Sequence, residues 1–147
     1  MTAPVFADTN VFVYQLDTRE AAKQRRARSW AEFLWATRRG RISFQVLQEL
    51  YVTVTRKLDP GMDTGAARTM VRALWAWRPA PIDEQVFAAA WAAQDRFSLS
   101  WWDSLIVGAA RVSGCSFLLT EDLQHGQDLD GLLVVSPFEL APADLGG

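Results

Sequence analysis

The sequence predicts an α/β protein in which a short, mostly parallel sheet is covered by helices on both faces. Short apolar segments alternate with helix-like segments along the chain, and this alternation is typical of parallel strands joined by helices. Of the 147 residues, 50% are hydrophobic and 22% are charged, a globular balance that supports a buried core. We expect one domain over residues 1–147, with residues 142–147 as a frayed tail.

The first strand ends at an acid. Val5 to Ala7 form a brief apolar run, and Asp8, Thr9 and Asn10 follow at once. Groups at the carboxyl ends of strands line the binding crevice of an open α/β sheet, so Asp8 is a candidate site residue. On this stretch alone, the better interpretation is that Asp8 or Thr9 only caps a helix around residues 11–14.

Helical periodicity predicts the next two helices. The first spans residues 19–39 and ends at Gly40. A very short strand follows at residues 41–43, and Ser43 caps a helix that runs from Phe44 to about Lys57. Glu49 lies at the border of the buried stripe of this second helix, on the same flank as Arg56, so its carboxylate can face a cleft.

The middle of the chain contains a turn at residues 59–61, a helix over residues 63–77, and a helix to about Phe97 that Asp83 caps. The next helix, over residues 102–113, is apolar almost all round, which indicates an internal helix. Asp103 lies in its first turn, where the helix dipole favours a negative charge.

The last strands complete the sheet. Residues 117–120 form the clearest strand of the chain, and this strand also stops at acids, Glu121 and Asp122. Residues 124–131 are expected to be a polar loop, and residues 132–135 a final strand.

Four acids thus have matching placements: Asp8, Glu49, Asp103 and Asp122. Carboxylates gathered in one crevice repel each other, so they either hold protons at raised pKa values or bind a hard cation. Oxygen ligands point to Mg²⁺ or Mn²⁺. The chain has only one cysteine and one histidine, which argues against a Cys/His zinc site.

These residues carry a resemblance to a known family. The segments Asp8-Thr9-Asn10-Val11, Gln48-Glu49-Leu50-Tyr51, Ser100-Trp101-Trp102-Asp103-Ser104-Leu105-Ile106 and Leu119-Thr120-Glu121-Asp122-Leu123-Gln124 together resemble a PIN domain, most closely the VapC toxins of bacterial type II toxin–antitoxin systems. The resemblance implies a three-layer α/β/α fold and an endoribonuclease that hydrolyses RNA with a metal-activated water. It also implies a homodimer that a VapB-type antitoxin holds inactive.

The resemblance also assigns roles to residues. It places the family's acids on Asp8, Glu49, Asp103 and Asp122, with Asp8 and Asp103 as the main ligands of Mg²⁺ or Mn²⁺. It places the supporting polar residues on Asn10 and Thr120. Between the neighbouring acids Glu121 and Asp122 we expect Asp122, because a strand that continued through Glu121 would point the two side chains in opposite directions.

The charge distribution is compatible with an RNA partner although the net charge is −2. Residues 1–78 contain 13 of the 15 Lys and Arg residues but 7 of the 17 Asp and Glu residues, which permits a basic face beside an acidic centre. Arg56 and Lys57 are candidate contacts to RNA phosphates. Because we recognise no signal peptide and no membrane span, we expect a cytoplasmic protein.

Two other functions remain open at this point. A phosphatase of the haloacid-dehalogenase kind also begins with a strand that ends in Asp, but it needs a second Asp where this chain has Asn10. A PIN-like module that binds RNA or protein without cleaving is the main alternative to the nuclease. Trp101 and Trp102 adjoin Asp103 and cannot both point inward, so one of them is a candidate lining residue of the cleft or of a groove for the antitoxin.

Overall fold

Five strands form one central sheet in the computed structural model, which describes residues 3–145. Their order is β2-β1-β3-β5-β4, and only β4 runs antiparallel to its neighbour. In the centre of the sheet, Phe6 of β1 pairs with Leu118 of β3, which in turn pairs with Val134 of β5. The strands are β1 (Val5–Ala7), β2 (Gly40–Arg41), β3 (Phe117–Leu119), β4 (Asp128–Leu129) and β5 (Leu132–Val135).

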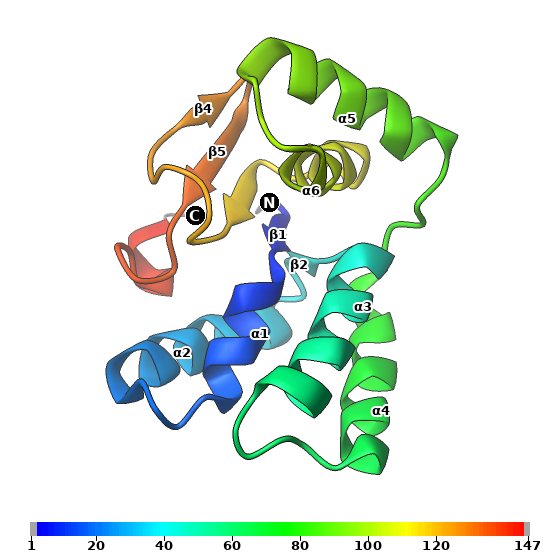
Figure 1. The fold of residues 1–147 in the computed structure, drawn as a ribbon. Coiled ribbons are helices and arrows are strands. Elements are labelled where there is room, and N and C mark those ends of the chain that lie inside the picture. The colour runs from blue at the N-terminus through cyan, green and yellow to red at the C-terminus, as the bar shows by residue number, and fades with distance from the viewer. Residues whose placement is uncertain (1–2, 146–147) are drawn as a thin grey trace.

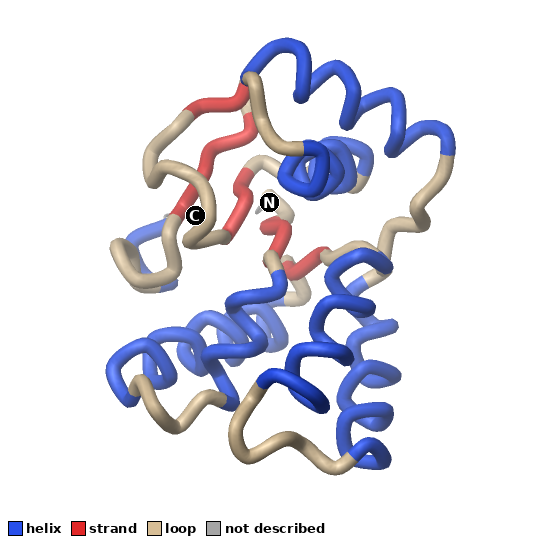
Figure 2. The backbone as a smooth tube through the Cα atoms, in the orientation of Figure 1, coloured by secondary structure: helices blue, strands red, loops and turns tan. Residues whose placement is uncertain are grey.

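Helices lie on both sides of this sheet. Helices α5 and α6 lie on one side, and α1 and α2 lie on the other (Figure 1). Helices α3 and α4 extend beyond β2, at the edge of the sheet (Figure 2). The helices are α1 (Thr9–Leu16), α2 (Ala21–Thr37), α3 (Phe44–Val52), α4 (Thr64–Ala73), α5 (Glu84–Phe97) and α6 (Trp101–Val112).

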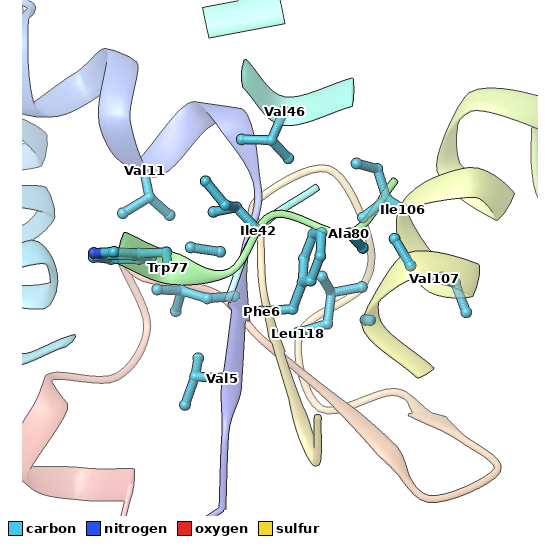
Figure 3. Close-up of a cluster of buried hydrophobic side chains, with 14 of the residues drawn as sticks. Val5, Phe6, Val11, Ile42, Val46, Trp77, Ala80, Ile106, Val107 and Leu118 are labelled. Carbon is cyan, nitrogen blue, oxygen red and sulfur yellow. The ribbon is translucent and has the colours of Figure 1, made fainter. Parts of the chain in front are cut away.

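The core forms on both faces of β1 because successive strand residues point to opposite sides. Val5 lies on the side of Val11 and Trp77, whereas Phe6 lies with Leu118 on the side of α6 (Figure 3). All of these side chains are buried. The predicted α/β architecture, with a mostly parallel sheet between two helical layers, is therefore confirmed.

Helices α5 and α6 approach each other closely at Gly108. A Cβ atom at this position would lie 2.8 Å from the backbone nitrogen of Ala90 and 2.9 Å from the carbonyl oxygen of Val86. Since both contacts are backbone atoms of α5, neither can move without shifting the helix. Gly108 is therefore required by the packing of the outer helix on the internal one.

The end of α2 differs from the prediction. The helix stops at Thr37, and Arg38 takes a left-handed conformation with φ of 57°. Gly40, which we expected to end the helix, instead lies in β2, where an added Cβ would come within 2.5 Å of the Trp77 ring. The glycine is thus explained by close packing against an indole rather than by helix termination.

A π-helical turn, Thr53–Lys57 (η1), continues α3 where we expected regular α-helix. The backbone nitrogen of Leu58 donates to the carbonyl oxygen of Thr53 at 2.9 Å, an i+5 to i hydrogen bond. The wider turn includes one extra residue and rotates everything after it relative to α3. The change therefore affects which of the two basic residues, Arg56 or Lys57, lies on the same side of the helix as Glu49.

Three shorter segments also differ from the prediction. The expected helix over residues 63–77 ends in a 3₁₀ segment, Leu74–Trp77, and the expected polar loop contains the short strand β4. Within the expected frayed tail, Pro142–Leu145 form a 3₁₀ helix, and residues 146–147 lie outside the described residues. Across residues 3–145, every helix is too short or too polar to cross a bilayer.

We predict that Gly108→Ala lowers the free energy of unfolding by about 1–3 kcal/mol, because its methyl group would overlap the α5 backbone. Urea denaturation followed by circular dichroism measures the change. Gly65→Ala is the matched control: this glycine is exposed in the first turn of α4, where alanine is the better helix former. Equal midpoints for the two variants would contradict the close packing of α5 on α6.

Candidate active site

Asp8 lies at the carboxyl end of β1 and is buried, with 5% of its surface exposed. Its Oδ2 accepts a hydrogen bond of 2.8 Å from the hydroxyl of Thr120, which directly follows β3. Its Oδ1 accepts from the backbone nitrogen of Thr9 at 2.7 Å, so Asp8 also caps α1. The two sequence interpretations of Asp8, as a helix cap and as a group at the strand ends, thus describe the same side chain.

Asn10 and Asp122 extend this contact. The Asn10 amide nitrogen donates to the Thr120 hydroxyl and to Oδ2 of Asp122, both at 3.3 Å. The backbone nitrogen of Asp122 donates to the same Thr120 hydroxyl at 3.1 Å. The neighbouring Glu121 points elsewhere and accepts from Lys23 at 3.1 Å. Of these two acids, Asp122 is the one that the hydrogen bonds connect to Asp8.

Glu49 joins the group through residues that the sequence reasoning did not assign to the site. Thr9 donates its hydroxyl to Oε2 of Glu49 at 2.9 Å, and the amide of Gln45 donates to Oε1 at 3.0 Å. The same Gln45 amide reaches the carbonyl oxygen of Trp102 at 3.3 Å, which ties α3 to the start of α6. The spacing of four residues between Gln45 and Glu49 on one helix is the signal that could have found this pair.

Asp103 is half-buried in the first turn of α6. Its backbone nitrogen is capped by the hydroxyl of Ser100 at 3.1 Å. Among residues 3–145 its carboxylate has no hydrogen bond to the other three acids, but its negative charge is one cause of the raised pKa of Asp122. Hydrogen bonds thus connect Asp8, Glu49 and Asp122, whereas Asp103 is connected to this group electrostatically.

Burial dominates the acidity of the site. It raises the pKa of Asp8 to about 7, and the charges of Asp122 and Glu49 add to this, although the hydrogen bonds from Thr120 and Thr9 oppose the shift. The pKa of Asp122 is also raised, by partial burial and then by the charges of Asp103 and Glu121. This is the state expected of carboxylates held close together without a counter-charge.

The donor types at the site fit a hard divalent cation. Every candidate ligand is an oxygen, and the carbonyl oxygen of the Asn10 side chain is buried without a hydrogen-bond partner within residues 3–145. In that part of the chain no group of three or more His, Cys, Asp or Glu side chains is placed so that it could hold a metal ion. The acids are therefore gathered near one another but are not closed into a coordination group.

The two basic candidates, Arg56 and Lys57, both lie in the last turn of η1 but differ in their surroundings. Lys57 lines a hollow together with Glu49 and Thr9, whereas Arg56 is exposed and is not among the lining residues. We expected Arg56 to share the flank of Glu49, but Lys57, one residue further along the turn, is the basic residue that lines the hollow with Glu49. Arg39, another basic residue of the N-terminal half, is buried and donates to the carbonyl oxygen of Ala3.

We predict that Asp8→Asn stabilises the protein by a few kcal/mol at pH 8 when divalent cations are removed with EDTA. The folded-state pKa, about 7, lies above the unfolded value of 3.8. The contribution of Asp8 to stability is therefore fully present below about pH 3.8 and is lost as the pH rises through about 7.

Urea denaturation at several pH values measures this effect. The advantage of Asp8→Asn should grow between about pH 4 and pH 8. Asp95→Asn, a change of an exposed acid on α5, is the control and should track the wild type. Parallel stability curves for Asp8→Asn and the wild type would show that burial does not perturb this carboxyl.

Three solved structures share this fold. The first is a toxin–antitoxin complex from Klebsiella pneumoniae, with a TM-score of 0.63, 18% identity, and coverage of 94% of this chain and 100% of the other. The second is DNA-bound VapBC from Salmonella typhimurium, with a TM-score of 0.64, 15% identity, and coverage of 92% and 99%. The third is VapBC2 from Rickettsia felis bound to a promoter DNA fragment, with a TM-score of 0.60, 14% identity, and coverage of 90% and 97%.

At these identities the likeness concerns the fold alone. No curated protein matches the sequence. The sequence does match the PIN domain over residues 5–127, a stretch that includes Asp8, Glu49, Asp103 and Asp122. Since this match covers most of the chain and agrees with the sheet and the placement of the acids, the protein belongs to the PIN domain family.

Proposed function

We propose that the protein is a metal-dependent endoribonuclease and the toxin of a type II toxin–antitoxin system. The observation that carries the proposal is the buried Asp8 at the carboxyl end of β1, to which short chains of hydrogen bonds through neutral residues connect Asp122 and Glu49. Membership in the PIN domain family and candidate ligand atoms that are all oxygens favour Mg²⁺ or Mn²⁺ as the cofactor.

In this proposal Asp8, Glu49, Asp103 and Asp122 hold the cation, with Asp8 and Asp103 as the main ligands. Such an ion, when bound, supplies Lewis-acid activation of water and stabilises the charge that develops on a phosphodiester. Thr120 and the backbone nitrogen of Thr9 hold the Asp8 carboxylate in one orientation. Asn10 orients Asp122, while Thr9 and Gln45 orient Glu49.

The toxin assignment is supported by the structural neighbours. Two of them are described as VapBC and one as a toxin–antitoxin complex, and this chain covers nearly the whole of each matched chain. By analogy we propose a VapB-type antitoxin as the partner, a homodimer as the assembly and the cytoplasm as the location. The phosphatase alternative is disfavoured because Asn10, at the position of its second acid, donates to Asp122 and Thr120.

We predict that the purified protein cleaves RNA in the presence of Mg²⁺ or Mn²⁺ and that EDTA abolishes cleavage. Asp8→Asn and Asp103→Asn should each reduce the rate at least about a hundredfold, because each removes a charged ligand. Gel analysis of total RNA measures the rate, and Asp95→Asn is the matched control. Cation binding is checked separately by the rise in melting temperature on adding Mn²⁺, which both site variants should lose.

Equal cleavage by the wild type and both site variants would overturn the site assignment. A wild type that binds RNA but does not cut it with either cation would favour the alternative, a non-cleaving PIN-like module that binds RNA or protein.

We predict that a small protein encoded next to this one forms a stable complex with it and suppresses its cleavage of RNA. Co-expression followed by size-exclusion chromatography tests the complex, and the RNA assay tests the inhibition. Cleavage that proceeds unchanged in the presence of every adjacent gene product would remove the toxin assignment and leave the nuclease assignment in place.

A further inference from the structure

A hollow of about 540 Å³ adjoins the acids. It lies between α3 with its π-helical turn and the start of α6, and it shares Thr9 and Glu49 with the candidate site. Its other walls include Gln48, Val52, Lys57 and Trp102. A volume of several hundred cubic ångströms is typical of small-molecule pockets and is ample for one nucleotide.

Trp102 presents an indole to this hollow. It is 66% exposed, whereas the adjacent Trp101 is half-buried and packs edge-on against Phe87 at 5.3 Å between ring centroids. This difference answers the question that the sequence left open, because Trp101 belongs to the α5–α6 contact and Trp102 faces outward. The amide of the buried Gln45 donates to the carbonyl oxygen of Trp102, and this hydrogen bond fixes the backbone at the start of α6 that carries the exposed ring.

The charges around the indole suit an RNA strand. Lys57 lies at the rim and forms no ion pair with any acid in residues 3–145. Glu49 contributes the other charge, and both of its oxygens already accept from Thr9 and Gln45. The amide of Gln48 offers a donor and an acceptor. An aromatic face, a free cation and an amide are the groups that bind a single-stranded nucleotide.

We propose that this hollow is a base-binding subsite for the nucleotide next to the scissile phosphodiester of single-stranded RNA. The base stacks on Trp102, Gln48 contacts the base edge, and Lys57 contacts a backbone phosphate. The inference rests on the proposed function, because it places that base relative to a phosphodiester held at Asp8 and Glu49. It makes Trp102 a determinant of where the RNA is cut.

The test is the affinity of a fluorescently labelled, single-stranded RNA oligonucleotide, measured by anisotropy with Ca²⁺ present and with a gel to check that the RNA stays intact. Trp102→Ala should weaken binding about tenfold, and Trp102→Phe should restore most of the loss. Trp91→Ala is the matched control, since Trp91 is 53% exposed on α5 and does not line the hollow. Lys57→Ala should reduce the slope of the logarithm of the RNA binding constant against the logarithm of the salt concentration by about the amount that one phosphate contact contributes.

Mapping of cleavage ends with Mn²⁺ gives a second measurement. Relative to the wild type, Trp102→Ala should relax the nucleotide preference at one position beside the cut, whereas Trp91→Ala should leave it unchanged. Equal affinity and equal cut sites for Trp102→Ala and the wild type would overturn the subsite. So would a wild type that does not bind the RNA.

The two proposals fail differently. If the wild type cuts RNA and Trp102→Ala behaves identically, the subsite is wrong and the nuclease stands. If Trp102→Ala loses RNA affinity but the wild type never cuts, the hollow binds RNA, but the nuclease assignment and the position of the subsite beside a scissile bond are wrong. Trp102→Ala could instead keep its RNA affinity and lose only its binding to the small protein encoded next to this one. In that case the hollow binds a segment of that protein, and the RNA subsite is overturned.

Discussion

A carboxylate carried into the interior at the end of a central strand is the constraint on which this site depends. Asp8 leaves β1 between β2 and β3, so its partners must come from the elements that meet there. Thr120 follows β3 and supplies a hydroxyl, and the start of α1 supplies a backbone N–H. Because burial penalises the charged form of Asp8, this arrangement favours either a proton or a cation at the carboxylate.

Two consecutive residues, Thr9 and Asn10, connect two of the other acids to this carboxylate. Asp8 is connected through Thr120 to Asn10 and Asp122, whereas Thr9 donates to Glu49 on α3. The short polar segment after β1 therefore reaches both sides of the crevice. The residues that make these connections, Thr9, Asn10 and Thr120, are neutral, so they orient the carboxylates without supplying a counter-charge.

Part of the basic excess of the N-terminal half is used within the protein. Arg39 is buried against Phe33 and a backbone carbonyl, and Arg41 donates to the carbonyl oxygens of Arg38 and Gly40. Lys23 pairs with Glu20 and Glu121. These three cations bind acceptors within the protein, so the number of Lys and Arg residues in this half overstates the positive charge that is free to attract RNA.

Local rules predicted much of the fold. Asp8, Ser43 and Asp83 cap the helices that follow them, and the last strand has the bounds expected from its apolar run. The end of α2 could not be predicted, because nothing near Gly40 in the sequence shows that it will meet a tryptophan 37 residues later. The hydrogen bond from Gln45 to the carbonyl oxygen of Trp102 could not be predicted either, because the two residues are 57 positions apart.

The π-helical turn was the least predictable feature, and it has the largest consequence for the site. In a regular α-helix through residue 57, Arg56 would follow Glu49 on the same flank, two turns later. The extra residue in the turn puts Lys57 there instead, as a compact charge on a flexible stem. Within the described residues the hydrogen-bond donors to Glu49 are the neutral side chains of Thr9 and Gln45. Its negative charge therefore remains free for a cation, while the lysine remains free for a phosphate.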